Sequence, residues 1–213
     1  MRGEFELIAH YLAPLTADAP GAFGLTDDGA VLAGNGGPAR VITLETLVAG
    51  THYLPQDPAD LVARKALRVN LSDLAAMGAR PESYLLSLAL APEVPESWVD
   101  GFAQGLRADQ ANYGVTLLGG DTTRTAGPTT ISVTAVGSTV GSRVLRRNGA
   151  RVGDGVYVSG TIGDAALGLA VARGASGDDG DPDSHALAAR YRLPQPRVDL
   201  GAALCERGLA SAA

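Results

Sequence analysis

The sequence predicts an α+β fold in which a mixed sheet is covered by helices, and three features support this class. Segments with strand and helix patterns alternate over residues 1–140, as expected when helices pack on one sheet. Tight turns separate these segments, because 28 glycines and 12 prolines are spread over the 213 residues. A hydrophobic content of 46% with 19% charged residues is typical of a folded globular chain.

The N-terminal segments are short and are divided by turn-forming residues. Residues 4–13 have the spacing of a short amphipathic helix, and a loop rich in Ala, Pro and Gly follows. Strands are expected over 31–32 and 39–47, joined by the glycine-rich turn 34–38. Two neighbouring strands joined in this way are expected to begin the sheet.

A long helix is predicted after Asp57, which we expect to cap it, with Pro58 in its first turn. It is expected to end at Gly78. Asn70 and Asp73 are three residues apart and therefore share one side of this helix. An apolar stripe at helical spacing is expected to face the core and consists of Leu67, Leu71 and Leu74.

In the second half of the sheet, glycines and prolines again separate the predicted strands and helices. A buried strand is expected over 84–91, a helix from Pro95 to about residue 113, a second buried strand over 115–118 and a further strand over 129–136. The order strand, helix, strand, helix, strand, strand predicts one layer of sheet covered by two helices.

Residues 1–140 are predicted to form an N-terminal domain, and residues 141–213 to begin a C-terminal α+β domain. A new strand is expected over 155–159, followed by helices over 163–173, 187–191 and 196–207, with an acidic loop over 176–183. A domain that begins near residue 142 is not expected to be complete at residue 213. We therefore expect the chain to be incomplete at its C-terminus.

Charge and cysteine content exclude several classes of partner. The formal net charge of −6 argues against a nucleic acid or an anionic membrane surface as the partner. Cys205 is the only cysteine, so an internal disulfide is excluded, and a buried thiol in a reducing cytoplasm is expected. No apolar run approaches the roughly 20 residues of a membrane span. We expect a soluble, cytoplasmic protein.

Carboxylates in separate segments are the main chemical signal. They are Asp27, Asp28, Glu45, Asp73 and Asp121, and no neighbouring His or Cys suggests a transition-metal site. Acids from several segments repel one another unless a cation lies between them. Hard oxygen ligands favour Mg²⁺ or Ca²⁺, and Mg²⁺ commonly accompanies phosphates. The pattern therefore indicates nucleotide phosphate chemistry, provided that these segments meet in space.

Each of these segments also has a structural interpretation. Asp27-Asp28-Gly29 resembles an ordinary turn, and an exposed Glu45 would simply be solvated. Asp73 differs, since an unpaired carboxylate beside the core stripe is costly. Gly119-Gly120-Asp121 is either a tight hairpin turn or a backbone that approaches an anion while Asp121 holds a cation.

Basic groups and His52 complete the candidate set. The sequence has no G-x-x-x-x-G-K-[ST] loop, so phosphates would be held through cations with limited basic help. Arg143, Arg146 and Arg147 are either that help or a solvated basic linker. His52 lies in a predicted loop, where a single histidine is usually a surface residue.

Together these segments resemble the thiamine-monophosphate kinase family, within the superfamily of aminoimidazole ribonucleotide synthetase. The resemblance covers essentially the whole chain, and the helix segment 70–79 is its most specific part. Its carriers are Gly3-Glu4-Phe5 with Leu7-Ile8, residues 27–30, 45–52, 70–79, 119–124 and 147–150, and Ser159-Gly160-Thr161-Ile162-Gly163-Asp164.

The resemblance implies a kinase that transfers phosphate directly from ATP to thiamine monophosphate, giving thiamine diphosphate, with Mg²⁺ and no phosphoenzyme. No side chain is then a catalytic nucleophile or base. Carried over by position, Mg²⁺ ligands would be Asp28, Thr43, Glu45, Asp73 and Asp121. ATP contacts would be Gly120, Asp121 and Arg147, and His52 would contact the substrate. The family fold further implies a homodimer in which two N-terminal sheets join into a barrel.

The sequence departs from the family pattern at two points. Glu45 stands where Asp is usual, and Leu44 where a second hydroxyl is frequent, so a cation would shift or lose a ligand. A further acidic segment is expected beyond residue 213. Two alternatives stay open. One is another ATP-using enzyme of the superfamily, such as aminoimidazole ribonucleotide synthetase; selenophosphate synthetase usually has an N-terminal Cys or selenocysteine with a Lys, which this chain lacks. The other is a non-catalytic nucleotide-binding or dimerisation module.

Overall fold

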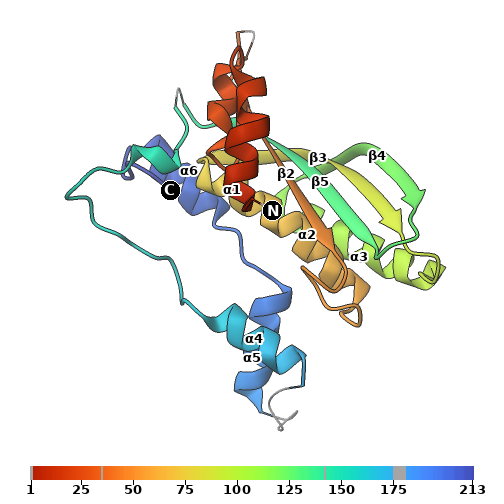
Figure 1. Ribbon diagram of the computed structural model, residues 1–213. Helices are drawn as coiled ribbons and strands as arrows, with labels where there is room; N and C mark the ends of the chain where they lie inside the picture. The colour runs from red at the N-terminus through yellow and green to blue at the C-terminus, as the bar shows by residue number, and fades with distance from the viewer. Residues whose placement is uncertain (1, 35, 142, 175–180) are drawn as a thin grey trace.

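A five-stranded mixed sheet with helices on one face is the centre of the computed structural model, which describes residues 2–34, 36–141, 143–174 and 181–213 (Figure 1). The strands are β1 Ala30–Leu32, β2 Arg40–Val48, β3 Ala79–Leu90, β4 Thr116–Arg124 and β5 Thr130–Thr139. The α-helices are α1 Glu4–Leu7, α2 Ala59–Ala76, α3 Glu96–Tyr113, α4 Asp164–Ala172, α5 Pro182–Arg192 and α6 Val198–Glu206. Shorter helical turns are Ile8–Leu12, Ala13–Thr16, Pro20–Leu25 and Arg147–Gly149. The predicted α+β class is confirmed.

The strand order is β1-β2-β5-β3-β4, and only the β3–β4 pair is parallel. The connection between these two strands is the helix α3, as a parallel pair requires. Figure 1 places α2 and α3 against the same side of the sheet, so the other side carries no helix over β3 and β5. The predicted layer of one sheet and two helices is therefore confirmed.

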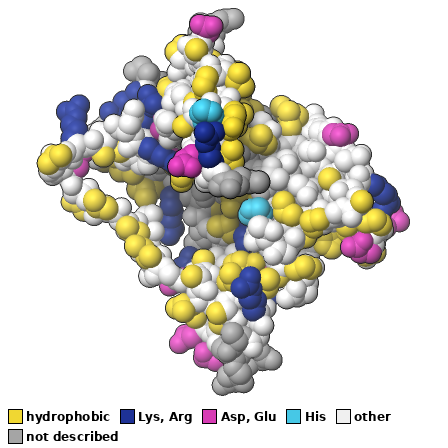
Figure 2. Space-filling model, viewed as in Figure 1, with side chains coloured by type: hydrophobic (Ala, Val, Ile, Leu, Met, Phe, Trp, Pro, Cys, Tyr) yellow, Lys and Arg dark blue, Asp and Glu magenta, His cyan; other side chains and the backbone are white. Residues whose placement is uncertain are grey.

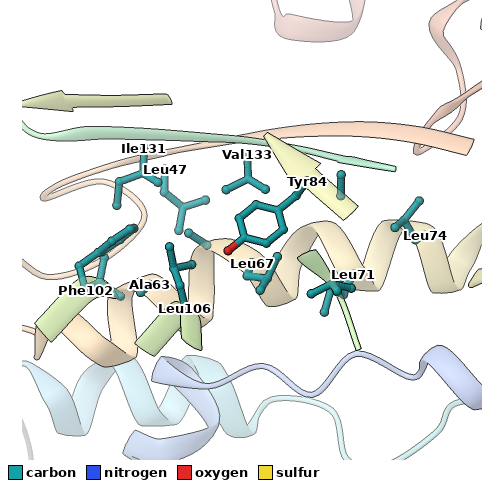
Figure 3. Packing of buried hydrophobic residues seen from close by; sticks show 14 of the residues in the cluster. Leu47, Ala63, Leu67, Leu71, Leu74, Tyr84, Phe102, Leu106, Ile131 and Val133 are labelled. Atoms are coloured by element: carbon teal, nitrogen blue, oxygen red, sulfur yellow. The ribbon is translucent and has the colours of Figure 1, made fainter. Parts of the chain in front are cut away.

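The core lies between α2, α3 and the sheet (Figure 3). Leu67, Leu71 and Leu74 are at most 1% exposed, which confirms the predicted stripe. Tyr84 and Val133 pack above this stripe from two adjacent strands. Burial of such side chains contributes roughly 1.5–3 kcal/mol each to folding, so this layer is the main source of the stability that holds the site.

The start of α2 differs from the prediction. Helical residues begin at Ala59, and no side chain caps the helix at Pro58. The Asp57 carboxylate instead accepts hydrogen bonds from the Leu54 amide (2.9 Å) and from Nε of Arg192 (2.8 Å). The expected cap is therefore wrong, because a loop amide and a distant arginine compete successfully for this carboxylate.

Strand β4 also differs from the prediction. The expected buried strand over 115–118 is longer, and all nine residues of β4 are exposed, since β4 is an edge strand. Gly119, Gly120 and Asp121 continue this strand, so they form neither a hairpin turn nor a loop. A Cβ added at Gly120 would collide with the Leu86 carbonyl, so glycine is required there by the close approach of β3.

The chain after residue 141 contains α4, α5 and α6, and the predicted helices there are confirmed. The strand predicted over 155–159 is wrong: this segment is extended but pairs with no strand that the structure describes. Its hydrophobic side chains are exposed, with Val156 at 95% and Tyr157 at 94%. The segment before α4 runs away from the sheet, and hydrophobic side chains lie along its surface (Figures 1 and 2). Of the acidic loop expected over 176–183, residues 176–180 lie outside the described residues, and Pro182 and Asp183 belong to α5 rather than to a loop.

Helix α6 packs against α2, with Gly201 so close to the Ala75 carbonyl that a side chain would not fit. Cys205 lies beside Gly78 and is 3% exposed, so the expected buried thiol is confirmed. The domain boundary near residue 141 stays a prediction. Among the described helices, none combines the length and apolar character needed to cross a membrane.

Candidate active site

The acidic segments meet in part, and Asp73 on α2 is the centre of the group that forms. Asp73 is half-buried, and burial is the main cause that raises its pKa to about 7. The negative charges of Glu45 and Asp28 raise this pKa further, whereas the positive charge of Arg147 lowers it. Asp28 from the loop before β1 and Glu45 from β2 therefore both lie within electrostatic reach of Asp73 on α2.

Two adjacent arginines approach the acids from the segment after β5. Nε of Arg146 donates to Asp27 at 2.8 Å, and the Arg147 guanidinium pairs with Asp28. The Asp27 side chain is only 1% exposed, and the Arg147 amide also donates to it at 2.9 Å. The interpretation of Arg146 and Arg147 as a solvated linker is therefore wrong. Arg143 lies apart and donates to the Ala210 carbonyl.

Thr43 is held beneath the acids by the helix. It is 2% exposed, and its hydroxyl donates to the Asn70 side-chain oxygen at 3.3 Å. Asn70 is fully buried and donates in turn to the Ala66 carbonyl at 3.0 Å. This chain of hydrogen bonds fixes the distance between β2 and α2, and thus the relative position of Glu45 and Asp73.

Asp121 lies in a different part of the sheet. Strand register aligns it with Ser87, Ser132 and Thr46, and the hydroxyls of Ser132 and Thr46 are 2.9 Å apart. Three strand spacings, about 14 Å, therefore separate Asp121 from β2. Side chains alternate along a strand, so Asp121 shares the helix-free face with Thr46, while Glu45 is on the helix side with buried Val133.

The donor set suits a hard cation, but the side chains do not form a ready-made cage. Carboxylate oxygens are the ligands that Mg²⁺ prefers. Burial and then the charges of Glu45 and Asp28 raise the Asp73 pKa, and a bound cation would favour the ionised carboxylate against both effects. Within the described ranges, no group of three or more acidic, His or Cys side chains is close enough to hold one metal ion. The assigned metal ligands therefore stay a prediction.

His52 lies in the loop that follows β2 and is exposed, as expected. Its Nδ1 accepts a hydrogen bond from the Val48 amide at 2.9 Å, and its own amide donates to the Val48 carbonyl at 2.9 Å. Because Nδ1 is engaged, only Nε2 can contact a ligand. The ring is thus presented in one orientation at the end of β2.

Two contributors to this region were missed by the sequence analysis. Asp27 was grouped with Asp28, although only the structure shows that each acid has its own arginine. Lys65 was not considered, yet its ammonium contacts the His52 carbonyl at 2.9 Å. A usable signal existed, since Lys65 is the only lysine among the 17 basic residues counted as Lys and Arg.

The mixed sheet, the helices on one face and the acid–arginine group together define the class: an α+β protein of the AIR synthase type. The model of the family described as AIR synthase related protein, N-terminal domain, matches residues 26–139. The chain belongs to this family.

Curated relatives agree with the resemblance inferred from the sequence. A thiamine-monophosphate kinase from Salmonella typhimurium is 46% identical over 213 residues, covering 99% of this chain and 64% of the relative. One from Caulobacter vibrioides is 45% identical over 198 residues, covering 92% of this chain and 55% of the relative. The chain thus spans between about half and two thirds of the length of these relatives, and the predicted resemblance is confirmed.

Solved structures lead to the same group. The structure described as "AaThiL complexed with AMPPCP and TMP" matches with a TM-score of 0.86 and 32% identity, covering 97% of this chain and 65% of that chain. A thiamine-monophosphate kinase from Stenotrophomonas maltophilia matches with a TM-score of 0.70 and 38% identity, covering 92% and 64%. A hydrogenase maturation protein HypE in complex with ATP, at 18% identity and a TM-score of 0.56, shares the fold alone.

Proposed function

We propose that the full-length protein transfers a phosphoryl group from ATP to thiamine monophosphate, giving thiamine diphosphate, and that it acts with Mg²⁺ in the cytoplasm. The similarity to thiamine-monophosphate kinases extends over 99% of this chain in one relative, and a structural match carries AMPPCP and TMP in its description. The observation within this chain that carries the proposal is the half-buried Asp73 carboxyl, whose pKa is raised by burial and by the charges of Glu45 and Asp28 and lowered by that of Arg147.

Phosphoryl transfer needs positioning and charge neutralisation more than covalent participation by the protein. When bound, Mg²⁺ would supply the positive charge that offsets the phosphates and the acids. Asp28, Glu45 and Asp73 would hold it, and Arg147 would orient a phosphate through its fixed fork of N–H donors. Arg147 can pair with Asp28 and also contact a phosphate, because 55% of its side chain is exposed when the ion pair is formed.

Thr43 would keep β2 and α2 in register through its hydrogen bond to Asn70, and would offer its hydroxyl oxygen to the cation from beneath the acids. His52 would contact thiamine monophosphate through Nε2. The backbone at Gly120 would approach ATP from the edge strand β4, since glycine has no side chain of its own. Asp121 would act from the helix-free face of the sheet.

A homodimer through the helix-free face accounts for the placement of Asp121. Leu44 is 63% exposed and Leu85 is 46% exposed, and strand register aligns both with Thr134 on this face. Burial of this apolar surface against a second copy would remove it from water. Gly120 and Asp121 would then lie at the rim of the interface.

The decisive experiment measures thiamine diphosphate formation by the full-length protein with ATP and Mg²⁺. We expect turnover by the wild type and a loss of at least about 100-fold in Asp73→Asn, because the variant removes charge without changing shape. Asp100→Asn is the matched control, since Asp100 is an exposed carboxylate on α3 that accepts a hydrogen bond from Gln104 on the same helix.

Other outcomes would redirect the assignment. Turnover with a different phosphate acceptor, but none with thiamine monophosphate, would identify another ATP-using enzyme of the superfamily. Binding of ATP without any turnover would identify a non-catalytic module. Wild-type turnover in Asp73→Asn would contradict the role given to Asp73.

A further inference from the structure

We propose that Lys65 is a positioning residue for the substrate site, and that the C-terminal end of α5 holds Lys65 in place. The segment positioned is the His52 loop, residues 49–54. The inference rests on the proposed function, because it takes His52 as a contact for thiamine monophosphate. Helix α5 reaches this loop by two routes, through Lys65 on α2 and through Asp57 before α2.

The first contact is between Lys65 and the loop backbone. Nζ of Lys65 donates to the His52 carbonyl oxygen at 2.9 Å. A hydrogen bond from a charged donor is stronger than a neutral one. The His52 ring is meanwhile tied to the Val48 amide. The peptide and the ring of His52 are thus fixed from two sides, which leaves little freedom for Nε2.

The second contact is between Lys65 and α5. The Lys65 ammonium lies 3.8 Å from the centroid of the Tyr191 ring, in a cation–π arrangement. Both side chains are half-buried, and burial lowers the Lys65 pKa while Asp57 raises it. A half-buried ammonium is restricted to few directions, so the aromatic ring and the His52 carbonyl together determine where it lies.

The third contact ties the far side of the same loop to the next residue of α5. Asp57 is 5% exposed and accepts from the Leu54 amide and from Nε of Arg192, which is 135 residues away in sequence. Tyr191 therefore acts on the loop through Lys65, and Arg192 acts on it through Asp57. The loop conformation depends on the last turn of α5 as well as on β2.

Loss of the Lys65 contacts should affect the binding of one substrate selectively. Displacement of His52 by a fraction of an ångström weakens contacts to the group it binds. Asp28, Glu45 and Arg147 belong to other segments, and Asp73 lies about two helical turns further along α2. Among the described residues, the partners of the Lys65 ammonium are His52, Tyr191 and Asp57, and none of the acids of the site. Loss of Lys65 should therefore affect thiamine monophosphate and leave ATP almost unaffected, which a general loss of stability would not do.

The test uses the full-length protein and compares Lys65→Met with Lys65→Arg. In Lys65→Met we expect the KM for thiamine monophosphate to rise about tenfold, the change produced by about 1.4 kcal/mol of binding energy. The KM for ATP and kcat should stay within about twofold. Lys65→Arg should restore most of the loss, since a guanidinium also donates and stacks on an aromatic ring.

A second pair of variants leaves Lys65 in place, which keeps the test informative if Lys65→Met does not fold. Tyr191→Leu should raise the same KM. Tyr191→Phe retains the ring and loses only the hydroxyl, which interacts with the Leu54 backbone, so its rise in KM should be smaller. Hydrogen exchange of the amides in residues 48–54 should be faster in Lys65→Met and Tyr191→Leu, with exchange in α3 unchanged.

Two results would overturn the positioning role. One is an equal rise of both KM values in Lys65→Met. The other is wild-type exchange of the His52 loop in both Lys65→Met and Tyr191→Leu. If the wild type itself does not phosphorylate thiamine monophosphate, the proposed function fails, and the exchange measurement alone decides whether Lys65 fixes the loop.

Discussion

The Arg147 guanidinium pairs with the Asp28 carboxylate, although 119 residues separate them in sequence. The preceding pair, Arg146 with Asp27, repeats this relationship and is more buried, with Arg146 also 3.9 Å from the centroid of the Phe23 ring. The inner pair anchors the segment after β5 to the turn before β1. The outer pair remains at the surface, where Arg147 can exchange its carboxylate for a phosphate.

Binding of ATP with Mg²⁺ should stabilise the protein and depend on Arg147. At about 100 times the dissociation constant, we expect the free energy of unfolding to rise by about 2.7 kcal/mol, measured by denaturant titration. EDTA should abolish the gain. Arg147→Met should reduce it, while Arg151→Met, which removes a nearby exposed arginine, should not. Equal stabilisation of both variants would contradict the phosphate role of Arg147.

Asp73→Asn should raise the melting temperature of the metal-free protein at about pH 8 but not at about pH 5. The folded-state pKa of Asp73 is raised to about 7, above the usual value of about 3.9 for an unfolded chain. The folded protein therefore holds this proton more tightly. Wild-type stability falls as pH rises from about 4 through about 7. A melting-temperature difference that does not change with pH would contradict this account.

Asp109→Asn should destabilise the protein by about 3–5 kcal/mol, because it leaves a buried arginine without its counter-charge. Asp109 is fully buried and accepts from Nε and Nη2 of Arg68 at 2.6 and 2.9 Å and from Arg64 at 3.1 Å. Urea denaturation measures the loss. Glu82→Gln is the control, since its pair with Arg40 is more than 40% exposed and should be worth less than about 1 kcal/mol.

Leu85→Glu should weaken self-association without unfolding the monomer. Leu85 is 46% exposed on the helix-free face of the sheet, so a charge there costs little in the monomer but is expensive in a buried interface. Sedimentation velocity of the full-length protein should show a shift toward monomer. Leu200→Glu, a similarly exposed leucine at 42% on α6, should leave the association unchanged.

Much of the fold follows from local patterns in the sequence. The spacing of Leu67, Leu71 and Leu74 predicts the buried stripe, because an apolar face of a helix is stabilised by packing against the core. Gly114 ends α3 in a left-handed conformation, as its position after the apolar pattern indicates. Predictions failed where neighbours decide: the 155–159 pattern suits a strand, but a strand needs a partner for its backbone groups.

The candidate site divides in the same way. The sequence predicts which residue types form the site, since carboxylates without histidine or cysteine indicate a hard cation. The sequence does not predict the distances between these residues. The alternation of β2 and the order of the strands place Asp121 on the opposite face from Glu45, and neither fact is present in a local motif.

The sequence alone determined the class of fold, the core stripe of α2 and the residue types available for phosphate chemistry, because these depend on local periodicity and on side-chain chemistry. Only the tertiary structure decided that Asp28 and Asp27 each meet an arginine, that Asp121 stands apart, and that Lys65 connects α5 to the His52 loop. Contacts between distant segments depend on strand order and on which of several competing groups forms a hydrogen bond or ion pair with a given side chain. Neither is encoded in the spacing of residues along the chain.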